Sequence, residues 1–161
     1  NLCGARVGCI ISHNKDVMAA AMKFAQARLC PPVLGQMAAI GALDTPDEYF
    51  DAVKEEYIKR RDFMIEGLNR MEGVFTPLPM GAFYTIAELP VDDTESFANW
   101  MLENFRIDNE TTMVTPAASF YKTPGKGKNH ARIAYVLEID EMKKALHILE
   151  EGLKAYPGRT L

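Results

Sequence analysis

A long amphipathic helix with a well-marked start is the feature that most limits the fold of this chain. Thr45, Pro46 and Glu48 form a capping box with proline at the first helical position. Apolar side chains then recur every three, four or seven residues as far as Met71, and Gly73 is expected to end the helix. At 1.5 Å per residue the helix would be roughly 35–40 Å long. This length predicts an element that bridges two structural units.

The residues before this helix predict a small, separate unit. The run 5–12 is apolar and is expected to form a buried strand. Asn14 is placed to cap a helix that continues to about Arg28, and the prolines at 31 and 32 should stop it. A second helix is expected over residues 34–43, where glycines and alanines allow close packing against another element.

The residues after the long helix predict a sheet with helices packed on one face. Strands are expected over 74–77, 82–89, 112–115 and 130–137. One helix should be capped by Asp93 or Thr94 and the last helix by Asp140. Residues 116–129 form a loop that is too long for a simple hairpin. This order is typical of a small α+β layer.

Composition and charge exclude several classes of function. With 161 residues, 48% hydrophobic content and a net charge of -4, the chain resembles an ordinary globular protein, with no expected nucleic-acid or membrane partner. Cys3, Cys9 and Cys30 form no metal-binding spacing with the three histidines, so no metal site is expected. The cysteines are interpreted as reduced thiols, which predicts a cytoplasmic location.

Two arginines are candidate anion ligands. Arg132 lies in the mostly apolar run 130–137, where a desolvated guanidinium needs an anion, and its fork of donors suits a carboxylate. A structural ion pair with Glu88 or Glu138 is the alternative. Arg6 lies between Gly4 and Gly8, where small residues let the backbone approach a ligand closely, and it could reach a phosphate.

Three short segments, two of which contain these arginines, occur in an order typical of one protein family. Gly-Ala-Arg-Val-Gly at 4–8, Pro-Met-Gly-Ala-Phe-Tyr at 79–84 and His-Ala-Arg-Ile-Ala at 130–134 resemble the class I/II aminotransferases of fold type I, which depend on pyridoxal 5'-phosphate (PLP). The resemblance covers residues 1 to about 156 and is closest to aspartate aminotransferase-like members. It implies an α/β fold overall. Residues 1–45 would be a remnant of the large domain, 46–72 an interdomain helix and 73–161 the small α+β domain.

The same resemblance implies roles for both arginines. Arg6 would bind the cofactor phosphate and Arg132 the α-carboxylate of the substrate, whereas residues 81–84 would be more structural than chemical. The substrates would be an amino acid and a 2-oxo acid. Arg28 is a possible ligand for a second carboxylate, although a solvated charge at a helix end is the simpler interpretation.

No catalytic residue is expected within the chain. The family's Schiff-base lysine precedes the phosphate-binding arginine by eight residues, which counts back to three residues before Asn1, and none of the lysines present substitutes for it. Because the chain also begins without methionine, it is expected to be the C-terminal part of a transaminase and inactive alone. Family members are homodimers, and remnants of that interface are expected around residues 29–43.

Other functions stay open from the sequence. A PLP-dependent lyase on the same scaffold would share both arginines. A free-standing α+β module could bind a small acid through Arg132 without chemistry. A purely structural or interaction domain would pair Arg132 internally.

Overall fold

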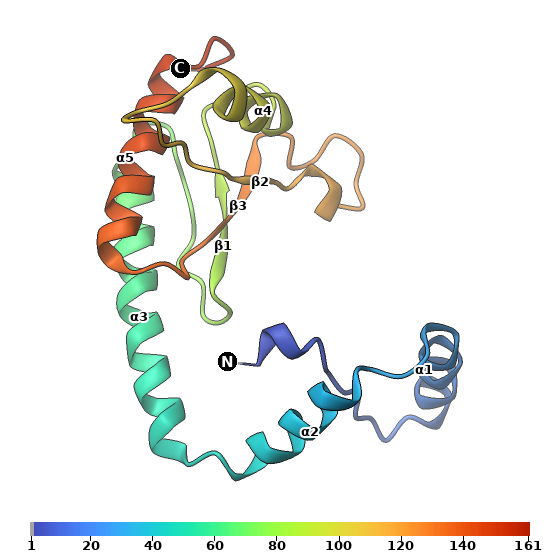
Figure 1. Ribbon diagram of the computed structural model, residues 1–161. Coiled ribbons are helices and arrows are strands. Elements are labelled where there is room, and N and C mark those ends of the chain that lie inside the picture. The colour runs from blue at the N-terminus through green and yellow to red at the C-terminus, as the bar shows by residue number, and fades with distance from the viewer. Residues whose placement is uncertain (1) are drawn as a thin grey trace. The chain divides into compact units, whose positions relative to one another are not determined.

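The computed structural model describes residues 2–161, which divide into two compact units, Asn1–Asp51 and Ala52–Leu161. The division lies inside the long helix α3 (Asp47–Arg70), so this helix contributes to both units (Figure 1).

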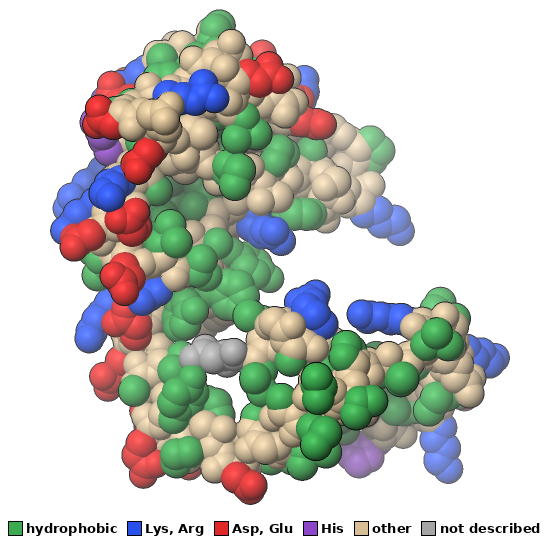
Figure 2. Space-filling model, in the orientation of Figure 1, with side chains coloured by type: hydrophobic (Ala, Val, Ile, Leu, Met, Phe, Trp, Pro, Cys, Tyr) green, Lys and Arg blue, Asp and Glu red, His purple; other side chains and the backbone are tan. Residues whose placement is uncertain are grey.

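The first unit contains helices that the sequence largely predicted. A short 3-10 helix, η1 (Cys3–Ala5), precedes α1 (Lys15–Arg28), α2 (Val33–Gly41) and a second 3-10 helix, η2 (Ala42–Asp44). Asn14 caps α1 as expected, because its side chain accepts hydrogen bonds from the backbone N–H groups of Asp16 and Val17. Large apolar side chains remain at the surface over α1 and α2 (Figure 2).

The predicted strand over residues 5–12 is wrong. These residues form the end of η1 and then irregular structure, and Cys9, Ile10 and Ile11 are exposed. A strand is stable only when its backbone N–H and C=O groups pair with a neighbouring strand. Residues 2–51 contain no strand that could serve as that neighbour.

Helix α3 agrees with the sequence to within one residue at each end. It begins at Asp47, one residue after the expected first position, and ends at Arg70, one residue before Met71. Gly73 then adopts a left-handed conformation with φ of 76°, as expected for a glycine that terminates a helix.

The second unit is built on a three-stranded antiparallel sheet. Its strands β1 (Tyr84–Glu88), β2 (Thr115–Pro116) and β3 (His130–Ala134) lie in the order β1-β3-β2. Helix α4 (Thr94–Asn104) connects β1 to β2, and α5 (Ile139–Ala155) follows β3. Helices α3 and α5 lie side by side along the sheet, as Figure 1 shows, with Gly67 of α3 in close contact with Leu146 of α5.

Several boundaries in this unit differ from the prediction. The strand expected over 74–77 is reduced to a single bridge between Phe75 and Glu88, and β2 starts at the last residue of the strand expected over 112–115. Asp93 caps α4 as predicted, but the residue at the cap of α5 is Glu138, and Asp140 lies in the first turn. Strand length depends on which residues find a partner, and one sequence does not contain that information.

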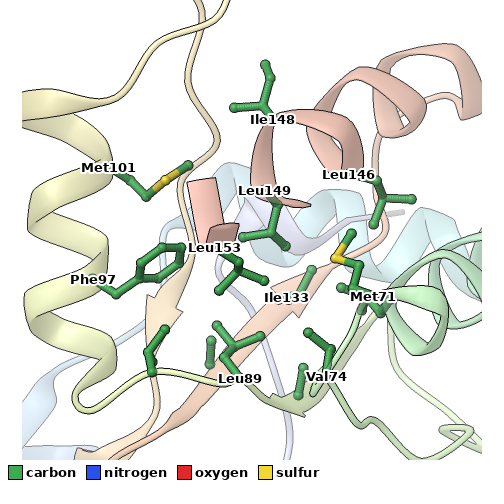
Figure 3. Close-up of a cluster of buried hydrophobic side chains, with 14 of the residues drawn as sticks. Met71, Val74, Leu89, Phe97, Met101, Ile133, Leu146, Ile148, Leu149 and Leu153 are labelled. Atoms are coloured by element: carbon green, nitrogen blue, oxygen red, sulfur yellow. The ribbon is translucent and has the colours of Figure 1, made fainter. Parts of the chain in front are cut away.

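The hydrophobic core of the second unit lies between the sheet and its helices. Alternate residues of β3 and its extension, Ala131, Ile133 and Tyr135, are buried. They pack with side chains from α3, α4, α5 and the segments between the elements. Ten residues of this core are labelled in Figure 3: Met71, Val74, Leu89, Phe97, Met101, Ile133, Leu146, Ile148, Leu149 and Leu153. Each large side chain buried in this way contributes about 1.5–3 kcal/mol.

No helix within residues 2–161 is both long and apolar enough to cross a membrane.

Candidate functional site

Arg132 occupies the middle of the central strand of the sheet. It lies opposite Ile86 of β1 on one side and Thr115 of β2 on the other. Because its neighbours Ala131 and Ile133 point into the core, Arg132 points to the other face, where it is exposed. The expectation that the guanidinium is desolvated in an apolar run is therefore wrong, since the strand alternates and its polar face is open to solvent.

Two aromatic rings lie against the Arg132 guanidinium. Its central carbon lies 5.5 Å from the ring centre of Tyr84 in β1 and 5.3 Å from that of Phe120, which ends the 3-10 helix η3 (Ala118–Phe120) after β2. These distances are within the range of cation–π interactions. The two rings come from the segments on either side of β3, so they restrict the long side chain without neutralising its charge.

Arg132 forms no ion pair with any carboxylate of the described residues. Of the two acids considered as internal partners, Glu88 accepts a hydrogen bond of 3.0 Å from the side chain of Asn129, and Glu138 lies at the start of α5. The guanidinium thus keeps donors available to an external anion.

The turn that precedes Tyr84 is anchored to a buried side chain. Buried Tyr135 donates its backbone N–H to Phe83 O (2.9 Å) and its hydroxyl to Ala82 O (3.2 Å). Ala82 has a positive φ of 62°, which is strained for alanine and needs such support. Burial raises the pKa of Tyr135, and the nearby charge of Arg61 opposes this shift in part. The Tyr135 hydroxyl therefore stays protonated and able to donate at neutral pH.

A pocket of about 390 Å³ borders β3, and Arg132 is among the residues that line it. Its walls are formed mainly by residues 111–115 and by core side chains of α5, namely Met142, Leu146 and Leu149. These α5 side chains pack with Ile133, on the face opposite to the Arg132 side chain. The pocket therefore lies mainly between the 111–115 segment and the core, and it reaches the strand that carries Arg132.

Arg6 lies in the first unit, directly after η1. Its backbone is left-handed with φ of 53°, and Nη1 donates to Cys3 O at 3.1 Å. The chain around it packs tightly on α2, because a side chain on buried Gly35 would come within 2.7 Å of Ala5 O. Close packing through the small residues of α2 is thus confirmed at Gly35, and it fixes the segment that carries Arg6.

The arrangement at Arg6 fits a phosphate ligand. The guanidinium is exposed, forms no ion pair within residues 2–161, and has N–H donors beyond the one given to Cys3. Gly4 and Gly8 on either side leave open space where side chains would otherwise stand. A doubly charged phosphate could therefore approach both the guanidinium and the adjacent backbone.

The remaining candidate residues are an arginine and three cysteines. Arg28 is exposed in the last turn of α1, where its charge is favourable towards the helix dipole. Cys3, Cys9 and Cys30 are exposed free thiols. Among residues 2–161, no group of three or more His, Cys, Asp and Glu side chains is close enough to hold a metal ion.

A family model provides the decisive comparison. The model for aminotransferase class I and II matches residues 1–149, which is most of the chain. The chain belongs to this family.

Individual aminotransferases agree with this assignment. An aspartate aminotransferase from Rhizobium meliloti is 26% identical over 163 residues, covering 94% of this chain and 37% of the relative. A solved aspartate aminotransferase structure from Thermotoga maritima is 27% identical, with a TM-score of 0.71, over 94% of this chain and 36% of that protein. The chain thus spans a little over a third of these aminotransferases.

A third protein supports the fold alone. An α-aminoadipate aminotransferase from Thermus thermophilus, solved in complex with N-(5'-phosphopyridoxyl)-L-leucine, is 23% identical with a TM-score of 0.71, and matches 89% of this chain and 36% of its own. Together these structures show that the chain has the fold of part of a fold-type I PLP-dependent aminotransferase, as the sequence predicted.

The sequence did not reveal the aromatic neighbours of Arg132. Residues 81–84 were expected to be mainly structural, yet the Tyr84 ring lies against the guanidinium, and Phe120 was hidden in a long loop. The order of the strands and their register bring these residues together, and a single sequence specifies neither. The only available signal was the position of Tyr84 in a predicted strand.

Proposed function

We propose that this chain is the C-terminal part of a PLP-dependent aminotransferase that moves an amino group from an amino acid to a 2-oxo acid, with aspartate aminotransferase-like specificity. The observation that carries the proposal is the exposed Arg132 guanidinium, restrained by two rings and without a carboxylate partner among the described residues, in a chain of this family. Its ligand would be the α-carboxylate of the amino acid.

Arg132 would bind and orient the substrate. A planar guanidinium binds a carboxylate through two parallel hydrogen bonds, which fixes the direction as well as the position of the acid. The Cα–H bond is then presented in one orientation, and the loss of rotational freedom is compensated by binding energy before the reaction. Because Arg132 lies on a paired central strand, the anchor itself moves little.

Arg6 would hold the phosphate of PLP. It fits this role because its guanidinium is free of carboxylates, and because the packing of Ala5 on Gly35 fixes the adjacent backbone. When bound, PLP supplies a conjugated ring that stabilises negative charge at the substrate Cα. The chain's own contribution would be to neutralise the phosphate and to hold the amino acid.

The proton transfer would require a lysine that these 161 residues do not supply. The lysines of this chain lie mostly on helix surfaces or in the 117–129 loop, and none is assigned that role. We therefore expect residues 1–161 to be inactive by themselves, so a test of activity or PLP binding requires the full-length protein.

Exchange of each arginine in the full-length protein tests the proposal. Arg132→Lys should raise KM for the amino acid and lower kcat/KM, since a lysine cannot form the bidentate pair, while PLP is retained. Arg6→Ala should instead weaken PLP retention through dialysis. Arg106→Lys and Lys23→Ala are matched controls, because both residues are exposed charges in the same units as the two arginines.

The outcomes distinguish this function from the alternative functions. Unchanged kcat/KM in Arg132→Lys would contradict the substrate role, and full PLP retention in Arg6→Ala would contradict the phosphate role. Release of a 2-oxo acid and ammonia without transfer to a second acid would instead identify a lyase. A full-length protein that binds a small acid but no PLP would be a binding module.

The longer protein is also proposed to be a cytoplasmic homodimer. The proposal is supported by three exposed free thiols and by the apolar surface at 29–43, where six large side chains are well exposed: Leu29, Val33, Leu34, Met37, Ile40 and Leu43. Sedimentation of the full-length protein tests the dimer. A monomer over the working concentration range would refute this part.

A further inference from the structure

The loop between β2 and β3 is closed on itself. At its base the backbone N–H of Ala117 donates to His130 O at 2.9 Å, and the N–H of His130 donates to Gly127 O at 3.1 Å. Asn129 and Lys128 are further tied to the unit, through Glu88 and through Thr94 respectively. The loop therefore has a defined shape, although it is long and contains two glycines with positive φ, Gly125 and Gly127.

Tyr121 fills the inside of this loop. Its ring lies against buried Gly127, where a Cβ atom would come within 2.3 Å of two ring carbons. Its hydroxyl lies 2.8 Å from Nδ1 of His130, and the two rings meet edge to face at 5.5 Å. Tyr121 thus connects the far side of the loop to the strand that carries Arg132.

Phe120 immediately precedes Tyr121 and lies against Arg132. His130 and Arg132 are two residues apart on β3, so they lie on the same face of the sheet. The contact of Tyr121 with His130 therefore fixes where Phe120 contacts Arg132. A guanidinium on a flexible stem binds a carboxylate better when it is held in place before binding.

We propose that Tyr121 is a positioning residue for Arg132: anchored on Gly127 and His130, it holds Phe120 so that Phe120 and Tyr84 keep the guanidinium in its acid-binding orientation. The identity of the acid rests on the proposed function, whereas the anchoring of the loop does not. Two kinds of measurement on the full-length protein keep these claims apart.

The first measurement is the rate at which phenylglyoxal modifies Arg132, followed by peptide mapping with Arg106 as internal reference. Gly127→Ala is compared with Gly125→Ala. Both glycines have a similar φ, 73° and 77°, so alanine strains both backbones alike, but only the side chain at 127 would displace the Tyr121 ring. Gly127→Ala should speed modification of Arg132 about two- to fivefold, the factor that one exposed cation–π contact represents. Gly125→Ala should match the wild type.

A second set of variants keeps the test valid if Gly127→Ala fails to fold. Phe120→Leu should also speed the modification, whereas Phe120→Tyr, which retains a ring, should restore the wild-type rate. Tyr121→Phe keeps the packing on Gly127 but removes the bond to His130, so it should have an intermediate rate. Equal rates in Phe120→Leu, Gly127→Ala and Gly125→Ala would overturn the proposal.

The second measurement is steady-state kinetics with L-aspartate and 2-oxoglutarate as probes. Phe120→Leu and Gly127→Ala should raise KM for L-aspartate about two- to fivefold, with a smaller change in kcat and unchanged PLP retention, because the loop acts on substrate binding. Faster modification with unchanged KM would mean that the loop positions Arg132 but that Arg132 does not bind the acid, and the proposed function would fail instead. If the wild type is inactive but the variants show the same differences in labelling, the positioning of Arg132 stands and the proposed function fails.

Discussion

The two units of the chain differ in whether their large apolar side chains are buried or exposed. In residues 52–161 such side chains form a continuous core, from Met64 in α3 to Tyr156 after α5. In residues 2–51 Gly35 is the one buried residue, and Leu34, Phe24 and Leu43 are each more than three-quarters exposed. Both units contain well-capped helices, so helix formation alone does not account for the difference.

This difference in burial indicates where the stability of each unit comes from. A helix gains most of its stability from burying its apolar face, and short helices are marginal in water without that burial. The second unit provides the burial from its own residues. The first unit presents apolar faces that nothing within residues 2–51 covers, while its family relatives are almost three times as long as the chain. We therefore expect it to depend on other parts of a longer protein.

Separation of the two units should have the largest effect. Residues 46–161 expressed alone should unfold in one cooperative transition, whereas residues 1–45 alone should show no such transition and little helix. Circular dichroism during denaturant titration measures both. A cooperative transition in residues 1–45 would show that the exposed apolar faces are not a source of instability. It would contradict the proposed difference in stability between the two units.

A matched pair of leucines compares the units by single changes. Leu68 of α3 is completely buried and Leu34 of α2 is 81% exposed. Leu68→Ala should lower the free energy of unfolding by about 2–5 kcal/mol, because it removes packing and leaves a cavity. Leu34→Ala should change the free energy by about 0.5 kcal/mol or less. Denaturant unfolding of residues 1–161 provides both values. Similar losses would mean that α2 is covered in solution by a surface of the protein itself.

Most of the elements on which this comparison depends could be predicted from the sequence. The caps at Asn14 and Asp93 and the glycine at 73 are local signals, and the structure uses each as expected. The strand expected at 5–12 failed because strand formation requires a partner, and a periodic pattern does not reveal whether one is present. Helices carry their hydrogen bonds within themselves, so their prediction was more reliable.

The candidate site was also only partly predictable from the sequence. Arg132 and Arg6 were identified from residue type and from resemblance, whereas their surroundings came only from the structure. The expected burial of Arg132 failed because the alternation along β3 was not recognised in a run of apolar residues. Phe120 lies twelve residues before Arg132, and their contact depends on how the intervening loop closes. Tertiary pairing of this kind has no local signature.

Gly35 offers a smaller, functional test of the first unit. Gly35→Ala would place a methyl group within 2.7 Å of Ala5 O, a backbone atom that cannot move without shifting Arg6. Overpacking costs about 1–3 kcal/mol, so the Kd for PLP in the full-length protein should rise at least about fivefold. Gly41→Ala in the same helix is the control, because nothing lies within 4 Å of its Cβ position. An unchanged Kd in Gly35→Ala would show that Arg6 is not positioned through α2.

The pH dependence of the second unit should show the smallest effect. A hydrogen bond from Lys143, together with its charge, lowers the pKa of Asp140 in the first turn of α5. A carboxyl whose pKa is lower in the folded state stabilises the fold above its unfolded pKa. That contribution is lost as the pH falls through the folded pKa. In residues 46–161, Asp140→Asn should therefore reduce the loss of stability on acidification, and only slightly, because the pair is exposed to solvent.

Lys143→Met shows whether the pair itself is responsible. If the Asp140–Lys143 bond sets the pKa, Asp140→Asn should have less effect on the acid dependence when Lys143 is already replaced. If the positive end of the α5 dipole sets it instead, Asp140→Asn should have the same effect in both backgrounds. Urea unfolding of the four proteins between neutral pH and acid distinguishes these cases. Because this acid-sensitive pair lies on the solvent side of α5, both results leave the buried core of the second unit as the main source of its stability.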